Sequence, residues 1–177
     1  MCVLGECFNT FLNTAAMYFA CILLLSTRNA EYLHGNNKSP TLELLKDLSK
    51  GFKTYIVAGL PEIGEDSKLY NSAVVCDPNG DLIAKHRKLH LFDVDVPGGF
   101  SFKESSMFTP GKEITTFDTE FGKIGLGICN DLRYPEQSRI MAEKGASVLI
   151  FPSAFSLTTG PRHWETLLRA RAMDNQV

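Results

Sequence analysis

One cysteine stands where the surrounding pattern could make it reactive. Residues 125–128 are small and apolar, as in a buried strand, Cys129 follows them, and a helix is expected to begin near Pro135. A side chain on such a strand-to-helix turn is exposed, and nearby backbone N–H groups can hold an oxyanion. This is the arrangement of a nucleophile elbow, where a thiol attacks a carbonyl once its proton is removed. A buried structural cysteine at the end of a strand is the alternative interpretation.

The usual partner of a reactive cysteine is histidine, and the chain has four, at positions 34, 86, 90 and 163. His86 and His90 have a spacing that could hold a metal ion on a helix. Their segment follows a hairpin turn, however, and residues four apart on a strand are poorly placed to share one ion, so a solvated or hydrogen-bonding role is favoured. His163 is expected at the start of a helix.

Residues 85–88 (Lys-His-Arg-Lys) form a cationic run. Such a run normally indicates a solvated face. A lysine within it could instead be buried beside a carboxylate, and both interpretations stay open on the residues alone.

Composition excludes several classes of protein. The chain has 177 residues, of which 18 are Lys or Arg and 20 are Asp or Glu, so it carries no basic field for nucleic acid and no polybasic membrane patch. Its 44% hydrophobic content is typical of a soluble globular protein. The five cysteines are odd in number and form no Cys-x-x-Cys pair, which argues against a disulfide framework or a zinc site and favours reduced thiols.

The N-terminal part contains an unusual apolar run, from Ala15 to Leu25. A membrane span needs about 20 apolar residues, and this run is shorter. A buried segment is the favoured interpretation, so membrane association is not expected. A membrane or signal role and a segment foreign to this position are the alternatives.

Periodicity and turn residues predict alternating helices and strands, which indicates a mixed, layered α/β fold. Asn79-Gly80 between two strand-like runs predicts a hairpin. Glu120-Phe121-Gly122, between the runs 115–119 and 123–128, predicts a second one. The expected helices are 40–50, 135–144 and 162–174, and the expected strands are 54–60, 70–76, 82–87, 115–119, 123–128 and 146–151.

Several motifs together resemble the nitrilase, or carbon–nitrogen hydrolase, superfamily. Residues 127–136 resemble its cysteine signature, 86–93 its lysine signature and 4–9 its glutamate signature. Further motifs match at 102–105, 110–111, 152–155 and 159–164, and the order of the key residues is the family order. Segments 90–97, 154–161 and 174–177 look most like those of the omega-amidases.

The resemblance implies a catalytic role for each key residue. Cys129 would attack an amide carbonyl, with Glu6 as the general base for the thiol and later for water. Lys88 and the backbone N–H of Asn130 would stabilise the tetrahedral oxyanion, and Glu104 would orient Lys88 or the incoming amide. Ammonia would leave, and water would hydrolyse the thioester. No metal or organic cofactor is implied.

The resemblance also implies a fold and a substrate class. The fold would be the nitrilase-like αββα sandwich over residues 1–177, in a family that assembles at least as dimers. The partner would be a small-molecule amide, such as α-ketoglutaramate or α-ketosuccinamate. Deaminated glutathione is the alternative substrate, and an inactive interaction module is the alternative function. The expected location is cytoplasmic, with a mitochondrial one as the alternative.

The chain departs from the family pattern at several points. Gly5 stands where the family has proline, and Asn130 stands where it has an aromatic residue. Residues 11–25 are an atypical apolar insertion in place of a short loop. The domain is expected to be partial, lacking the first β-α-β unit before Glu6 and the closing strands after Val177.

Overall fold

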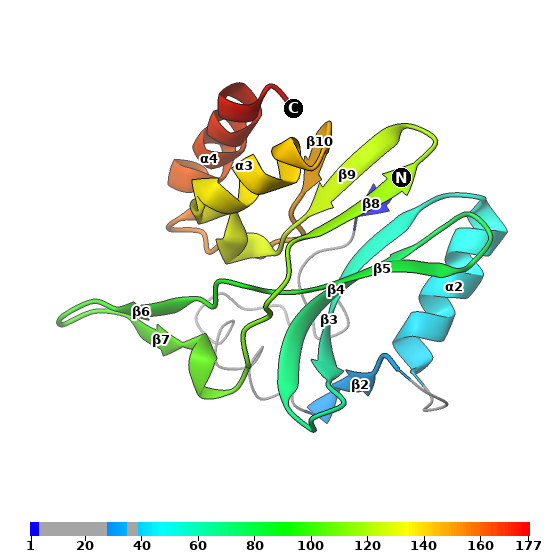
Figure 1. Cartoon of the computed structure of the whole chain (residues 1–177). Coiled ribbons are helices and arrows are strands. Elements are labelled where there is room, and N and C mark those ends of the chain that lie inside the picture. Colours follow the sequence, from blue (N-terminus) through cyan, green and yellow to red (C-terminus); the bar gives the residue numbers. More distant parts are fainter. Residues whose placement is uncertain (4–27, 35–38) are drawn as a thin grey trace.

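The computed structural model describes residues 1–3, 28–34 and 39–177, and Figure 1 shows their arrangement. Their strands are β1 (Cys2–Val3), β2 (Glu31–Tyr32), β3 (Ile56–Ile63), β4 (Leu69–Cys76), β5 (Leu82–Arg87), β6 (Asp93–Asp95), β7 (Ser101–Lys103), β8 (Thr115–Thr119), β9 (Gly122–Leu126) and β10 (Val148–Ile150). Their helices are α2 (Pro40–Phe52), α3 (Pro135–Glu143) and α4 (Gly160–Asn175), with short 3₁₀ helices η2 (Glu104–Ser106) and η3 (Cys129–Arg133).

The first sheet has the order β1-β3-β4-β5, with β2 also paired to β3. Strands β3, β4 and β5 are antiparallel, and β1 and β2 run parallel to β3. Because successive side chains of a strand point to opposite faces, β4 presents Ala73 and Val75 to one side of this sheet and Val74 and Cys76 to the other.

The second sheet has the order β10-β9-β8. β8 and β9 form an antiparallel hairpin, and β10 returns parallel to β9 after α3. The connection from β9 through η3 and α3 to β10 is therefore a strand–helix–strand unit, with Cys129 at its first turn.

Three apolar clusters hold the layers together. One lies between the two sheets and includes Val57, Val75 and Leu126. A second packs α2 on the outer face of the first sheet, and a third packs α3 and α4 on the second sheet. The layers run α2, first sheet, second sheet, then α3 and α4, which confirms the expected αββα sandwich (Figure 1).

Most of the expected elements are present, with shifted ends. Both expected hairpins form, and Gly80 has the positive φ of 88° that its turn requires. α2 continues two residues past the expected end, through Gly51, and β3 continues to Ile63. β10 is shorter than expected because only its middle three residues pair with β9.

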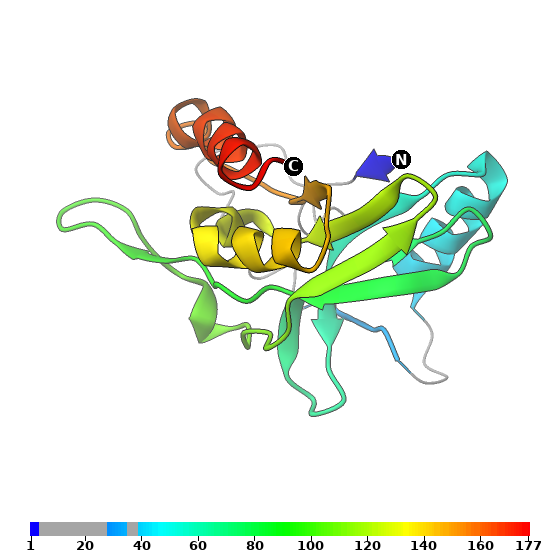
Figure 2. The ribbon, with the colours of Figure 1, turned by 45° about the horizontal axis from the view of Figure 1, so that its top comes forward.

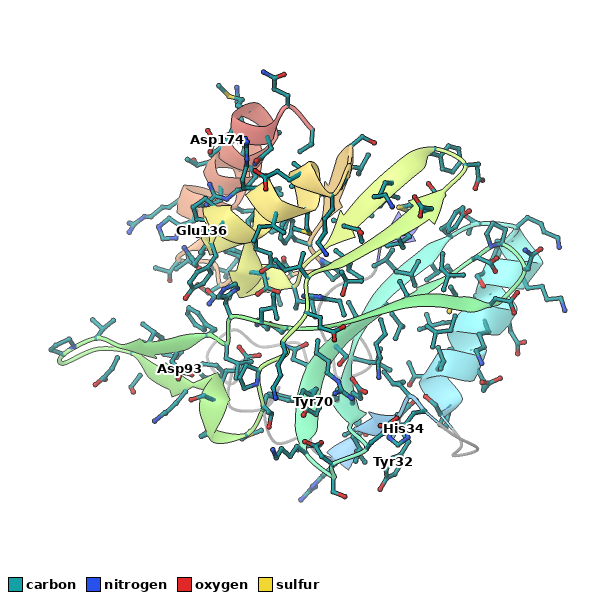
Figure 3. The ribbon with its side chains drawn as sticks, viewed as in Figure 1. Tyr32, His34, Tyr70, Asp93, Glu136 and Asp174 are labelled. Carbon is teal, nitrogen blue, oxygen red and sulfur yellow. The ribbon has the colours of Figure 1, made fainter. Side chains whose placement is uncertain are left out.

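The β6–β7 hairpin is an element that the sequence patterns did not predict. It projects from the body of the molecule in the turned view of Figure 2. Its strands are short, and Asp93, which Figure 3 labels near the base of the hairpin, accepts hydrogen bonds from the backbone and hydroxyl of Ser105. The hairpin links the segment after β5 to η2, so it connects the lysine motif to Glu104.

Candidate active site

Cys129 occupies a strained backbone position at the start of η3. Its φ is 44°, in the left-handed region that residues other than glycine rarely adopt. Its N–H donates to the carbonyl of Pro152 at 3.0 Å, which ties the turn to the segment after β10. The side chain is half-buried. The expected strand-to-helix turn is therefore present, and its geometry is that of a nucleophile elbow.

Lys88 and Glu104 form a buried ion pair. Their side chains are 2% and 6% exposed, and Lys88 Nζ lies 3.0 Å from Glu104 Oε2 and 3.2 Å from Oε1. A lysine is almost never buried without a partner, because removal of its charge from water is costly. This contact brings together two residues that the motifs placed sixteen positions apart.

Asn71 and Phe92 also donate hydrogen bonds to the carboxylate of Glu104. The Asn71 side-chain amide donates to Glu104 Oε1 at 2.9 Å, and the backbone N–H of Phe92 donates to Oε2 at 2.6 Å. Asn71 lies on β4, on the same face as Ala73 and Val75, which is the face toward the second sheet. Asn71 was not predicted from the sequence; the signal that could have identified it is a polar residue on the inward face of a buried strand.

Gly111 explains the Pro110-Gly111 motif. Its N–H donates to the carbonyl of Lys88 at 2.8 Å. A Cβ atom at this position would lie only 2.2 Å from the carbonyl oxygen of Arg87, so a side chain cannot be accommodated without moving backbone. The glycine allows the segment after η2 to support the chain that carries Lys88.

Asp131 joins the cysteine turn to the lysine segment. It is fully buried and accepts hydrogen bonds from the backbone N–H of Ile128 and of His90, each at 2.9 Å. The rings of His86 and His90 also contact it, at 3.2 and 2.8 Å. Burial alone would raise the pKa of Asp131, but the hydrogen bonds from His86 and His90 outweigh it and hold that pKa well below its ordinary value.

Asn130 reinforces the same connection with its side chain. Its amide donates to the carbonyls of His90 and Leu91, each at 3.2 Å. Only its backbone was expected to matter. The backbone N–H lies in the first turn of η3, where N–H groups have no acceptor within the helix.

The cationic run is not a solvated face. His86, on β5, is buried beside Asp131, and Lys88, directly after β5, is buried beside Glu104. Lys85 and Arg87 point to the opposite face, where both contact Oε1 of the buried Glu62 at 2.6 Å. The solvated interpretation fails because each charge has a carboxylate partner. For His86 and His90, the hydrogen-bonding role that the spacing favoured is the one observed.

Some predicted features lie outside the described residues. These are Glu6, the glutamate motif at 4–9 and the apolar insertion at 11–25. Within the described ranges, no group of three or more His, Cys, Asp or Glu side chains is arranged to hold a metal ion. No helix of those ranges has the length and apolar content needed to cross a membrane.

Comparisons with known proteins agree with the motifs. The family described as carbon-nitrogen hydrolase matches residues 1–177. The chain is 44% identical over 177 residues to the omega-amidase NIT3 of Saccharomyces cerevisiae, covering 99% of this chain and 58% of that protein. It is 46% identical over 176 residues to the human omega-amidase NIT2, covering 98% of this chain and 58% of that protein.

A solved structure gives the same result for the fold. The crystal structure of Saccharomyces cerevisiae Nit3, a member of branch 10 of the nitrilase superfamily, matches with a TM-score of 0.80 and 38% identity, covering 99% of this chain and 58% of that one. The chain therefore spans somewhat over half the length of the relatives it matches.

Proposed function

The chain belongs to the carbon–nitrogen hydrolase family, and from that premise we propose that it is an amidase of the omega-amidase type. It hydrolyses the terminal amide of small 2-oxo dicarboxylic acid monoamides, such as α-ketoglutaramate and α-ketosuccinamate, to the acid and ammonia. The omega-amidase names of relatives at 44% and 46% identity support this substrate class.

The observation that carries the proposal is the placement of Cys129. It stands on a turn of positive φ, and hydrogen bonds through Asp131 and Asn130 tie that turn to the segment directly after Lys88. A thiol can attack a carbonyl when a buried ammonium stabilises the developing negative charge.

The proposed first half-reaction forms a thioester. Glu6 accepts the proton of the Cys129 thiol, and the sulfur adds to the amide carbonyl to give a tetrahedral intermediate. The ammonium of Lys88 and the backbone N–H of Asn130 stabilise its oxyanion. The C–N bond then breaks, and the nitrogen takes the proton from Glu6 and leaves as ammonia.

The proposed second half-reaction restores the enzyme. Glu6 removes a proton from water, and the resulting hydroxide adds to the thioester carbonyl. The C–S bond breaks, the sulfur recovers a proton and the carboxylic acid departs. Glu104 takes no proton in this scheme. It holds the ammonium of Lys88 in place and keeps it charged, which its two contacts at 3.0 and 3.2 Å support.

The test is release of ammonia from α-ketoglutaramate by the purified chain. The Cys129→Ala variant should lose the activity, whereas Cys76→Ala, at a buried cysteine between α2 and the first sheet, should keep it. Faster turnover of deaminated glutathione than of α-ketoglutaramate would transfer the proposal to that substrate. No turnover of either amide by folded protein would favour the inactive interaction module.

A further inference from the structure

We propose that Asp131 is a positioning residue that sets the separation of Cys129 and Lys88, and that the donors on His86 and His90 are what hold Asp131 in place. The roles of Cys129 and Lys88 rest on the proposed function. The position of Asp131 between them rests on contacts among described residues alone.

The carboxylate of Asp131 is saturated with donors from three parts of the chain. Oδ1 accepts from the backbone N–H of His90 at 2.9 Å and from His90 Nδ1 at 2.8 Å. Oδ2 accepts from the backbone N–H of Ile128 at 2.9 Å and from His86 Nε2 at 3.2 Å. Four donors converge on one small rigid group with no exposed surface.

The two backbone donors lie on either side of the site. Ile128 immediately precedes Cys129, whose φ of 44° must be held by its surroundings. His90 follows Lys88 by two residues, so the same carboxylate anchors the lysine segment. A displacement of about 1 Å between reacting groups can reduce a rate by about a hundredfold. Asp131 is placed to prevent such a displacement.

The pattern requires an acceptor that has no hydrogen of its own. An ionised carboxylate only accepts, whereas an asparagine amide would direct an N–H₂ group at one pair of donors. The ring of His86 is held at both nitrogens, because Nε2 lies 3.2 Å from Asp131 Oδ2 and Nδ1 lies 3.0 Å from the hydroxyl of Thr115. His90 is held from the side by stacking on Tyr134, with ring centroids 3.6 Å apart.

The test measures covalent labelling of Cys129 by fluoroacetamide, resolved by peptide mass spectrometry. This reagent is a weak electrophile that carries a primary amide, so its reaction depends on how the site holds the amide. Cys76 is buried in a different layer and reports unfolding within the same molecule, because it becomes labelled by a general thiol reagent only if the fold opens.

Three variants separate positioning from general stability. Asp131→Asn replaces one of the two acceptor oxygens by an N–H₂ donor. His86→Leu removes the Nε2 donor, whereas His86→Gln can supply an amide N–H at nearly the same place. We expect Asp131→Asn and His86→Leu to slow the labelling of Cys129 by about tenfold or more, with Cys76 still protected, and His86→Gln to recover most of the rate.

Each other outcome overturns the proposal. Labelling of Cys129 at the parental rate in Asp131→Asn and His86→Leu would show that the site does not depend on these contacts. Exposure of Cys76 in all three variants would make Asp131 a residue of the fold and not of the site. If Cys129 of the unsubstituted protein reacts no faster than a free thiol, the site does not position this thiol.

Ammonia release, measured separately, tests the proposed function. If Cys129 of the unsubstituted protein is labelled quickly but the protein releases no ammonia, the proposed amidase function is refuted and the positioning role of Asp131 still stands.

Discussion

At the scale of single residues, the site is built from charges that are buried in pairs. Lys88 with Glu104, and Asp131 with its donors, lie between layers where an unpaired charge would be strongly destabilising. Each of these groups also contacts backbone: Glu104 accepts from Phe92, and Asp131 accepts from Ile128 and His90. These buried carboxylates therefore hold the backbone in position as well as balancing the buried positive charges.

Lys88→Met should abolish turnover and lower the free energy of unfolding by about 3–5 kcal/mol, because it leaves the Glu104 carboxylate buried without its cation. The double variant Lys88→Met/Glu104→Gln should regain part of that stability and none of the turnover. Urea unfolding and ammonia release measure the two effects. Equal stability of the single and double variants would contradict this account of the pair.

Gln137→Leu should stabilise the protein by about 1–2 kcal/mol. The Gln137 side chain is buried in α3, and neither its oxygen nor its nitrogen has a hydrogen-bond partner within the described structure. Leucine has a similar size and removes both unpaired atoms. Thermal or urea unfolding checks the change. Glu136→Leu is the matched control, because Glu136 is exposed at the start of the same helix (Figure 3), and it should change stability little.

The sequence predicted the residues that motifs carry, and missed those that only long-range contacts define. Cys129, Lys88 and Glu104 stand in recognisable segments, and Lys88 and Glu104 meet as expected. Asn71 reaches Glu104 across thirty-three positions, and Asp131 reaches His90 across forty-one. No local pattern encodes such a pairing, because it depends on the packing of two sheets.

At the scale of elements, prediction succeeded where periodicity was strong. α2 has apolar residues at helical spacing, and each expected hairpin has two strand-like runs joined by a glycine-containing turn. The β6–β7 hairpin was missed because its strands are only three residues long and are mostly polar or exposed. β2 was missed for a similar reason, since two residues are too few to show a period.

The two faces of α2 give a sharp test of its packing. Leu45 is fully buried against the first sheet, whereas its neighbour Leu44 is 52% exposed. Leu45→Ala should therefore lower the free energy of unfolding by about 2–5 kcal/mol. Leu44→Ala should change it by less than about 0.5 kcal/mol. Urea unfolding measures both, and similar losses in the two variants would mean that α2 does not pack as described.

At the scale of the whole molecule, two sheets packed face to face bring the chemistry to one end of their interface. The face of the first sheet toward the second carries Ala73 and Val75 in the apolar core, His86 directly across from Ala73 on β5, and Asn71 further along β4. The apolar core between the sheets therefore lies directly beside the polar residues of the site. The alternation of elements predicted a layered α/β class, and the resemblance predicted the αββα order. The register that aligns Ala73 with His86 could be seen only in the folded chain.

The outer face of the first sheet carries another buried carboxylate, in addition to Glu104 and Asp131. Glu62 is fully buried and accepts from Lys85, Arg87 and Ser72. Arg87 lies 3.9 Å from the centre of the Tyr70 ring, and Figure 3 labels Tyr70 on this sheet. Burial alone would raise the pKa of Glu62, but hydrogen bonds from Arg87 and Lys85 outweigh it and lower that pKa below its ordinary value.

Glu62 and Asp131 together should make the fold sensitive to acid. Both have pKa values lower in the folded than in the unfolded chain, so at acidic pH the unfolded chain binds more protons. Their contribution is complete above the unfolded carboxyl pKa, which is about 4, and is lost as the pH falls below it. The free energy of unfolding should therefore decline steeply from about pH 5 downward.

Glu62→Gln identifies the part of this slope that belongs to the outer face. The variant should be less stable than the parent at pH 7, because it loses the pairs with Lys85 and Arg87, yet its stability should fall less between about pH 5 and pH 3. Glu65→Gln, at an exposed glutamate nearby, should keep the parental slope. Urea unfolding at a series of pH values measures the slopes. Parallel curves for Glu62→Gln and the parent would mean that Glu62 binds its proton equally well in the folded and unfolded chains, and the network around it would then contribute nothing to acid sensitivity.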